Sequence, residues 1–150
     1  MSLFRLKWPS LYLRKRLAES LYFLRRYDEA IESIDRALLV NSQNESIWNT
    51  KGIILNTIGR SIESIECYNK ALRINPNNEN VLNSKGISLC NLGKYDEAIS
   101  CFDRILVLNP NAAQVLNNKG DVLTKLGRQA DAKRCYERAS KLGGKREIYR

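Results

Sequence analysis

The chain has 150 residues, of which 43% are hydrophobic and 27% charged, and these values suit one soluble globular domain. Its net charge is +9, it lacks histidine, and its four cysteines include no CxxC pair. This composition argues against a metal site or a disulfide framework and favours a reducing, cytoplasmic location. No apolar run approaches the roughly 18 residues that cross a bilayer, so no membrane association is expected.

Residues 1–10, MSLFRLKWPS, are too short and too interrupted by Arg5 and Lys7 to form a secretory signal. They are expected to form an N-terminal cap or the remnant of a preceding helix. Leu3, Phe4 and their apolar neighbours would pack on the residues that follow, and self-association through this segment is the open alternative.

The rest of the chain repeats with a period of 34 residues, which Gly52, Gly86 and Gly120 mark. The segments NTKGIILNTIGRSIESIECYNKALRINPNN and NSKGISLCNLGKYDEAISCFDRILVLNPNA are near-copies. A period near this length is typical of a solenoid of helical repeats. The repeats are assigned to residues 11–44, 45–78, 79–112 and 113–146, followed by a tail at residues 147–150.

Each repeat is predicted to contain two helices. In the second repeat, Ile47, Ile54 and Ile58 have helical spacing, and Gly59 stands where a left-handed residue ends a helix. A second amphipathic helix follows and stops at Asn75, because the residue before a proline is pushed out of helical geometry.

The first repeat differs at the position that ends its first helix. Arg25 stands there, in place of Gly59, Gly93 and Gly127 of the later repeats. A left-handed arginine costs about 1 kcal/mol, which leaves a different turn open in this repeat.

In repeats two to four, a small residue on the first helix is matched by a large residue on the second helix. Gly52, Gly86 and Gly120 of the first helices correspond to Tyr68, Phe102 and Tyr136 of the second helices. Because two helices can approach closely where side-chain bulk is absent, the aromatic rings are predicted to fill the space beside the glycines.

The apolar pattern of the second helices changes in the fourth repeat. The column of Ile31, Ile65 and Ile99 continues as Lys133, and the column of Leu38, Leu72 and Leu106 continues as Ser140. A terminal repeat needs a polar outer face, so repeat four is predicted to be a C-terminal cap. Most of the excess positive charge lies in this repeat, which fits either the cap or a basic binding site.

The pattern resembles the tetratricopeptide repeat (TPR) family. The second repeat carries the family's residues at Trp48, Gly52, Leu55, Tyr68, Ala71 and Pro76, and the resemblance covers residues 11–146. It implies an all-α fold, a right-handed α-α superhelix of about four helix-turn-helix repeats. First helices would line its concave face. The resemblance also implies a non-catalytic scaffold that binds a peptide or protein in the groove, without a cofactor.

Family geometry places an amide-rich set of side chains on the concave face. Asparagine offers both a donor and an acceptor to an extended peptide, and the alternative is that these asparagines bond within their own repeats. The candidate groove residues are Tyr12, Lys15, Tyr22, Asn49, Asn56, Asn80, Asn83, Asn91 and Asn117.

The family's carboxylate clamp, which grips the acidic C-terminus of chaperones, is not expected. Of the places that the clamp needs, only Lys15 matches, and Glu19 would repel a carboxylate. Tyr12, Tyr22 and Phe23 near Lys15 could form an aromatic and basic patch that would suit a protein partner or single-stranded nucleic acid. The open alternative is that these aromatic side chains belong to a cap or to the core.

No catalytic residues are expected, because the chain has neither histidine nor a phosphate-binding loop. Cys67, Cys101 and Cys135 share one column, but helices lie roughly 8–10 Å apart, so one cysteine per repeat cannot chelate an ion. Two alternatives to a protein-binding scaffold remain. The chain could bind nucleic acid through basic termini, or it could self-assemble through its N- or C-terminal repeat.

Overall fold

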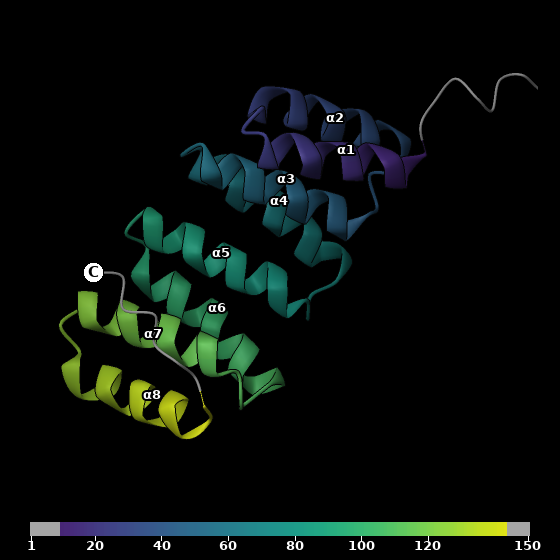
Figure 1. Cartoon of the computed structure of the whole chain (residues 1–150). Coiled ribbons are helices and arrows are strands. Elements are labelled where there is room, and N and C mark those ends of the chain that lie inside the picture. Colours follow the sequence, from purple (N-terminus) through teal and green to yellow (C-terminus); the bar gives the residue numbers. More distant parts are fainter. Residues whose placement is uncertain (1–9, 144–150) are drawn as a thin grey trace, which may run out of the picture. The chain divides into compact units, whose positions relative to one another are not determined.

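The computed structural model describes residues 10–143, and these form helices without a strand. The helices are α1 (Leu11–Phe23), α2 (Tyr27–Val40), α3 (Glu45–Thr57), α4 (Ser61–Ile74), α5 (Glu79–Asn91), α6 (Tyr95–Leu108), α7 (Ala113–Lys125) and α8 (Gln129–Lys141) (Figure 1). Each repeat therefore contributes two helices, which confirms the all-α class and the helix-turn-helix repeats. Of the predicted N-terminal cap or helix remnant at residues 1–10, all but Ser10 lie outside the described residues, as does the tail at residues 147–150.

The chain divides into two compact units, with the boundary after Pro76. Unit 1 contains α1 to α4, and unit 2 contains α5 to α8. Within unit 1, α1 packs on α2, α2 on α3 and α3 on α4, and unit 2 repeats this order from α5 to α8. The description of residues 1–150 as one domain stays a prediction.

The turns inside the repeats share one geometry. Gly59, Gly93 and Gly127 have φ values of 81°, 73° and 75°, and Arg25 has a φ of 58°. The amide of Arg26 donates to the carbonyl of Leu21 at 2.9 Å, as the equivalent amides do in the other repeats, and this bond closes the helix end. The first repeat therefore makes the same turn as the others, with an arginine in the left-handed position.

Asparagine residues form the N-caps of α3 and α5, the first helices of repeats two and three. The Oδ1 atom of Asn44 accepts from the amide of Ile47 at 3.2 Å, and that of Asn78 accepts from the amide of Val81 at 3.1 Å. Such caps satisfy amides that have no partner inside the helix. They therefore fix where α3 and α5 start.

The glycines of the first helices pack against aromatic rings, as the sequence predicts. A Cβ atom added to Gly86 would lie 2.6 Å from the ring of Phe102, and one added to Gly120 would lie 2.5 Å from Tyr136. Both distances are shorter than real carbon contacts, so only glycine fits. Gly52 meets Tyr68 in the same way in unit 1.

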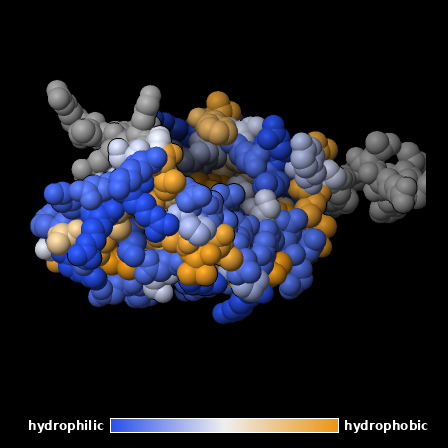
Figure 2. Space-filling model, turned by 90° about the horizontal axis from the view of Figure 1, so that it is seen from below, coloured by the Kyte–Doolittle hydropathy of each residue, from blue (hydrophilic) through white to orange (hydrophobic). Residues whose placement is uncertain are grey.

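The fourth repeat has the polar outer face that the sequence predicts. Lys133 and Ser140 are exposed, whereas Ile99 and Leu106 at the same positions of α6 are half-buried. The face of the molecule in Figure 2 is mostly hydrophilic, with small, separate groups of hydrophobic side chains. Within residues 10–143, no helix has the length and apolarity to span a bilayer.

Candidate binding pockets on the first helices

Unit 1 has an apolar pocket between its first helices, α1 and α3. Its volume is about 340 Å³, within the range of about 300–1,000 Å³ that is usual for ligand sites. The residues that line it are Glu19, Tyr22, Phe23, Thr50, Ile53 and Ile54. Phe23 is 81% exposed and Ile53 is 37% exposed, so apolar surface faces solvent at the pocket.

Contacts with neighbouring side chains hold the aromatic wall of this pocket in place. The hydroxyls of Tyr22 and Thr57 lie 3.3 Å apart and share a hydrogen bond. The Tyr22 ring also packs edge-on against Phe23, with centroids 5.6 Å apart, and lies 5.8 Å from Tyr27. Tyr22 is therefore fixed from several sides, while Phe23 has most of its surface free for a ligand.

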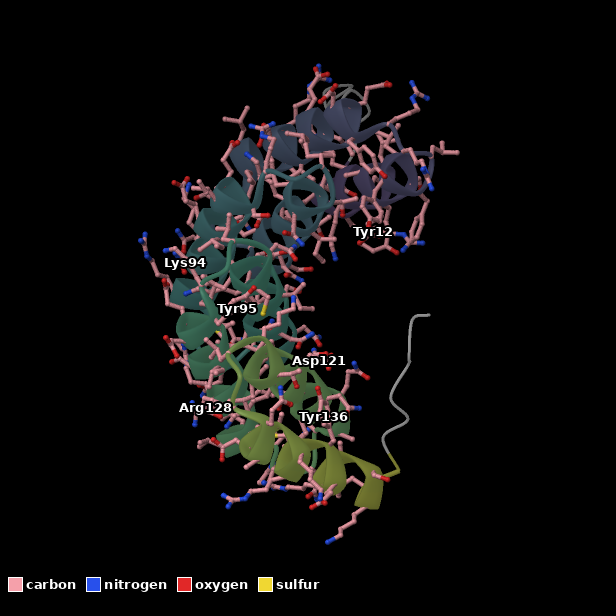
Figure 3. All side chains as sticks on the ribbon, turned by 90° about the vertical axis from the view of Figure 1, so that its left-hand side faces the viewer. Tyr12, Lys94, Tyr95, Asp121, Arg128 and Tyr136 are labelled. Carbon is pink, nitrogen blue, oxygen red and sulfur yellow. The ribbon has the colours of Figure 1, made fainter. Side chains whose placement is uncertain are left out.

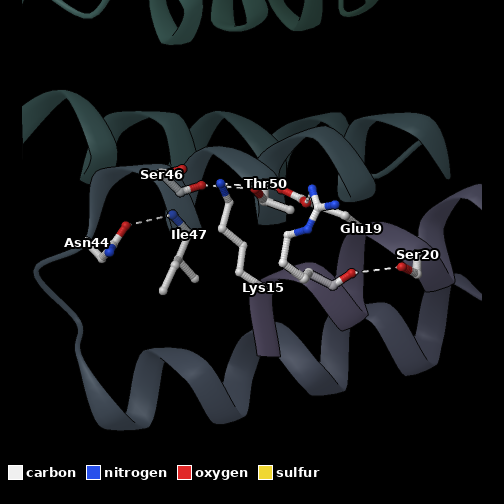
Figure 4. Close-up of polar contacts among 8 residues, drawn as sticks. Lys15, Glu19, Ser20, Asn44, Ser46, Ile47 and Thr50 are labelled. Carbon is white, nitrogen blue, oxygen red and sulfur yellow. Dashed lines mark hydrogen bonds and ion pairs between the residues drawn. The ribbon is translucent and has the colours of Figure 1, made fainter. Parts of the chain in front are cut away.

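Two cations near the unit 1 pocket share a single carboxylate, that of Glu19 (Figure 4). The Nζ atom of Lys15 lies 3.3 Å from Glu19 Oε1, and the Nη1 atom of Arg16 lies 3.1 Å from Glu19 Oε2. The hydroxyl of Thr50 donates to the carbonyl of Ser46 at 3.0 Å. The pocket therefore has mainly apolar walls beside a group of three side chains that keeps one net positive charge.

Unit 2 has a pocket at the equivalent place between α5 and α7, two repeats later in the sequence. Its volume is about 130 Å³, and its lining includes Ile87, Cys90, Asn91, Asn118, Asp121 and Val122. These six positions correspond, in order, to the six that line the unit 1 pocket. The fold therefore makes a hollow at the same positions twice, and the side chains make the one in unit 2 more polar than the one in unit 1.

Side-chain hydrogen bonds connect the helices around the unit 2 pocket. The amide of Asn118 donates to Asn83 Oδ1 at 3.0 Å, and the amide of Gln114 donates to Asn118 Oδ1 at 3.2 Å. The hydroxyl of Tyr136 donates to Asp121 Oδ1 at 2.7 Å, and the two side chains point toward one another in Figure 3. These bonds join α5 to α7 and α7 to α8.

Asn118 lines the unit 2 pocket, although the sequence pattern did not indicate it as a site residue. Asn118 shares its column with Thr50 and Ser84, which have short side chains, so the column does not look amide-rich. The signal that could have found it is Gln114 four residues earlier, because side chains at that spacing meet on a helix.

The predicted asparagine column is not uniform. Asn83 bonds Asn118 across α5 and α7. Asn117 is only 5% exposed, and its buried amide nitrogen has no hydrogen-bond partner within residues 10–143. Asn49 is half-buried, and its buried Oδ1 atom likewise has no partner there. Asparagine at one repeat position thus meets three different environments.

The remaining predicted groove residues lie nearer the surface. Asn56 is half-buried and accepts from the Ser61 hydroxyl at 3.1 Å. Tyr12 is 68% exposed, and Asn80 and Asn91 are exposed. Of these, Asn91 lines the unit 2 pocket.

The four cysteines are free thiols. Burial raises the pKa of the Cys67 thiol to about 11, and it also raises the pKa values of Cys90, Cys101 and Cys135. A raised pKa makes the reactive thiolate scarce at neutral pH. The described part of the chain has no group of metal-binding side chains.

Four tandem pairs of helices, three of them with a glycine packed against an aromatic ring, define a helical-repeat protein. Two family models described as tetratricopeptide repeat match the chain, one over residues 15–79 and the other over residues 77–143. The chain belongs to the tetratricopeptide repeat family.

Solved structures of MamA have a similar fold. One, a crystal structure of MamA, has a TM-score of 0.83 and 15% identity, and the match covers 89% of this chain and 78% of that one. A structure of MamA AMB-1 has a TM-score of 0.75 and 25% identity over 89% of this chain and 78% of that one. A second MamA AMB-1 structure has a TM-score of 0.77 and 24% identity, and the match covers 93% of this chain and 76% of that one. No curated protein matches the chain.

Proposed function

We propose that this protein is a non-enzymatic scaffold that binds a peptide or protein partner through the first helices of unit 1. Family membership supports a protein-interaction scaffold in general. The observation that carries the specific proposal is the apolar pocket between α1 and α3, with Phe23 81% exposed at its wall. Exposed aromatic side chains beside a pocket are typical anchors for a protein partner.

The partner would insert an apolar side chain into the unit 1 pocket. Tyr22 and Ile53 would contact that side chain, and burying it would provide most of the affinity. Lys15 is already paired with Glu19, so a clamp for a terminal carboxylate has no free cation here. The asparagines have a supporting role in this proposal, since Asn117 is buried and Asn83 is held by Asn118.

The two alternatives have weaker support. For nucleic acid, Lys15 and Arg16 near the aromatic patch of unit 1 both pair with Glu19, which leaves one net positive charge there to attract phosphates. Salt dependence of binding would reveal this function. For self-assembly, the exposed Lys133 and Ser140 make the outer face of the last repeat polar, which disfavours association through that repeat. Light scattering of the chain with and without residues 1–10 tests self-association through the N-terminus. A cytoplasmic location is part of the proposal and agrees with the free thiols.

The experiment is a selection from a displayed peptide library, followed by calorimetric titration of one selected peptide. Phe23→Ala is expected to weaken binding about tenfold, because it removes an anchor at the pocket. The matched control is Leu39→Ala, which truncates an 88% exposed side chain on α2 outside the pocket, and it should change affinity less than twofold. Failure to select any peptide, or equal effects of the two variants, would reject the proposal.

A further inference from the structure

A second hollow in unit 1 lies where the loop between α2 and α3 meets the end of α4. Its volume is about 240 Å³, and it is lined by Ser42, Gln43, Trp48, Lys70, Arg73 and Ile74. It shares no residue with the pocket between α1 and α3. An inference about it is therefore independent of the function proposed above.

The indole ring of Trp48 is held in a fixed position in this hollow. Its Nε1 atom donates to the carbonyl of Ser42 at 2.8 Å, which joins the ring to the loop before α3. The Nζ atom of Lys70 lies over the ring, 4.2 Å from its centroid. A cation at this distance is attracted to the ring face, so Lys70 is held in place before any ligand arrives.

Comparison with the first repeat shows what Trp48 changes. Arg36, the residue that corresponds to Lys70, forms an ion pair with Glu32 four residues before it. Lys70 has Glu66 at the same spacing but lies over Trp48 and makes no ion pair with any carboxylate of residues 10–143. The tryptophan thus keeps a positive charge available at the surface.

Arg73 adds a second charge to the same hollow. It lies one helical turn after Lys70 on α4, so the two side chains share a face. Arg73 also makes no ion pair within the described part of the chain, whereas Lys51, the other cation near the ring, pairs with Asp35 at 2.6 Å. The hollow therefore has two cations without a carboxylate above a floor formed by Trp48 and Ile74.

We propose that Trp48, Lys70 and Arg73 form a binding site for an acidic segment of a partner protein. A carboxylate would accept hydrogen bonds from the guanidinium of Arg73 and the ammonium of Lys70, and bonds between charged groups are the stronger kind. The methylene groups of a glutamate side chain would lie on the indole ring and Ile74. This apolar floor suits glutamate better than a small, strongly hydrated anion.

The site belongs to the second repeat alone. The position of Trp48 is occupied by Leu82 in repeat three and by Leu116 in repeat four, and both leucines are buried. In repeat four the residue equivalent to Lys70 is Arg138, which donates to the carbonyl of Pro110 at 2.6 Å. Its neighbour Lys141 occupies the place of Arg73 and supplies a matched control.

The test uses a chain with Trp8→Phe, so that Trp48 is its sole tryptophan. A capped peptide that alternates glutamate and glycine is titrated while the emission of Trp48 is measured, and a peptide with glutamine in place of glutamate is the control. Saturable binding of the glutamate peptide alone is expected. Lys70→Gln and Arg73→Gln should each weaken it at least fivefold, and Lys141→Gln less than twofold.

Three results would overturn the proposal. One is equal binding of the glutamine peptide, and another is an equal loss with Lys141→Gln, which would mean attraction by net charge only. The third is full competition by inorganic phosphate at the same concentration, which would indicate a small-anion site. Arg73 is exposed, so Arg73→Gln should fold normally and keeps the test valid if Lys70→Gln does not fold.

Discussion

The pockets of the two units show how one backbone supports two different surfaces. Both lie between first helices, and all six lining positions of the unit 1 pocket recur in the unit 2 pocket, which Phe102 and Lys125 also line. Tyr22 and Phe23 of unit 1 become Cys90 and Asn91 of unit 2, and Ile53 becomes Asp121. The repeated helix pairs place a hollow at the same positions in both units, and the side chains that line it decide what it can bind.

The packing that the two units share should be the feature most sensitive to substitution. Gly86→Val would drive a side chain into the ring of Phe102, where even a Cβ atom lies 2.6 Å away. We expect it to lower the free energy of unfolding by about 2–3 kcal/mol, measured by urea denaturation. Gly52→Val should cost a similar amount in unit 1, and a loss below 1 kcal/mol in either would contradict the shared packing.

The amide chain of unit 2, which is the hydrogen-bonded series Gln114, Asn118 and Asn83, should stabilise that unit, and the described residues of unit 1 have no equivalent series. Asn118→Ala would leave Asn83 and Gln114 without this partner, and we expect a loss of about 1–2 kcal/mol. Thr50 occupies the same column in unit 1, and its hydroxyl bonds only within α3. Thr50→Ala should therefore cost less in the same denaturation experiment, and equal losses would show that the amide chain adds nothing.

The residue at the left-handed position of the turn, Arg25 in unit 1 and Gly93 in unit 2, can be exchanged between the units. Arg25→Gly should stabilise the protein by about 0.5–1 kcal/mol, because glycine adopts a positive φ without the strain of a side chain. Gly93→Arg should destabilise it by a similar amount. Thermal unfolding of both variants measures the two changes, and shifts of the same sign would disprove this explanation.

The rates at which the thiols are alkylated should differ between the buried cysteines and the half-buried cysteine of the unit 2 pocket. Cys67 and Cys101 are buried in their units, while Cys90 is half-buried in the unit 2 pocket. At pH 8 we expect iodoacetamide to modify Cys90 before Cys67, slowly in both cases because both pKa values are raised. The rate at Cys67 should keep rising toward pH 11. Mass spectrometry of the modified chain measures this order, and faster reaction at Cys67 would contradict it.

The sequence predicted the framework because it repeats. The helix pairs, the fit of Gly86 to Phe102 and the polar end at Lys133 all follow from comparing residues one period apart. The turn at Arg25 could not be predicted in this way, since the cost of a left-handed arginine is small against the packing of two helices.

The candidate site was less predictable than the fold. A column describes a position in a repeat, whereas a pocket forms between residues of two repeats. Asn49, Asn83 and Asn117 look equivalent in the sequence, yet Asn117 is buried and Asn83 bonds Asn118. Which residues face each other depends on neighbouring columns, and Asn118 stands in a column whose other members are Arg16, Thr50 and Ser84.

The most direct test of the proposed function places one residue of the more polar unit 2 pocket in the apolar unit 1 pocket. Ile53→Asp places in unit 1 the side chain that unit 2 has at this position, and the affinity for a selected peptide is then measured by calorimetry. The matched control is Ile62→Asp, at a 67% exposed position on α4 outside the pocket. Binding through the unit 1 pocket predicts a loss of at least tenfold for Ile53→Asp and less than twofold for Ile62→Asp. Unchanged affinity in Ile53→Asp would show that the partner binds elsewhere.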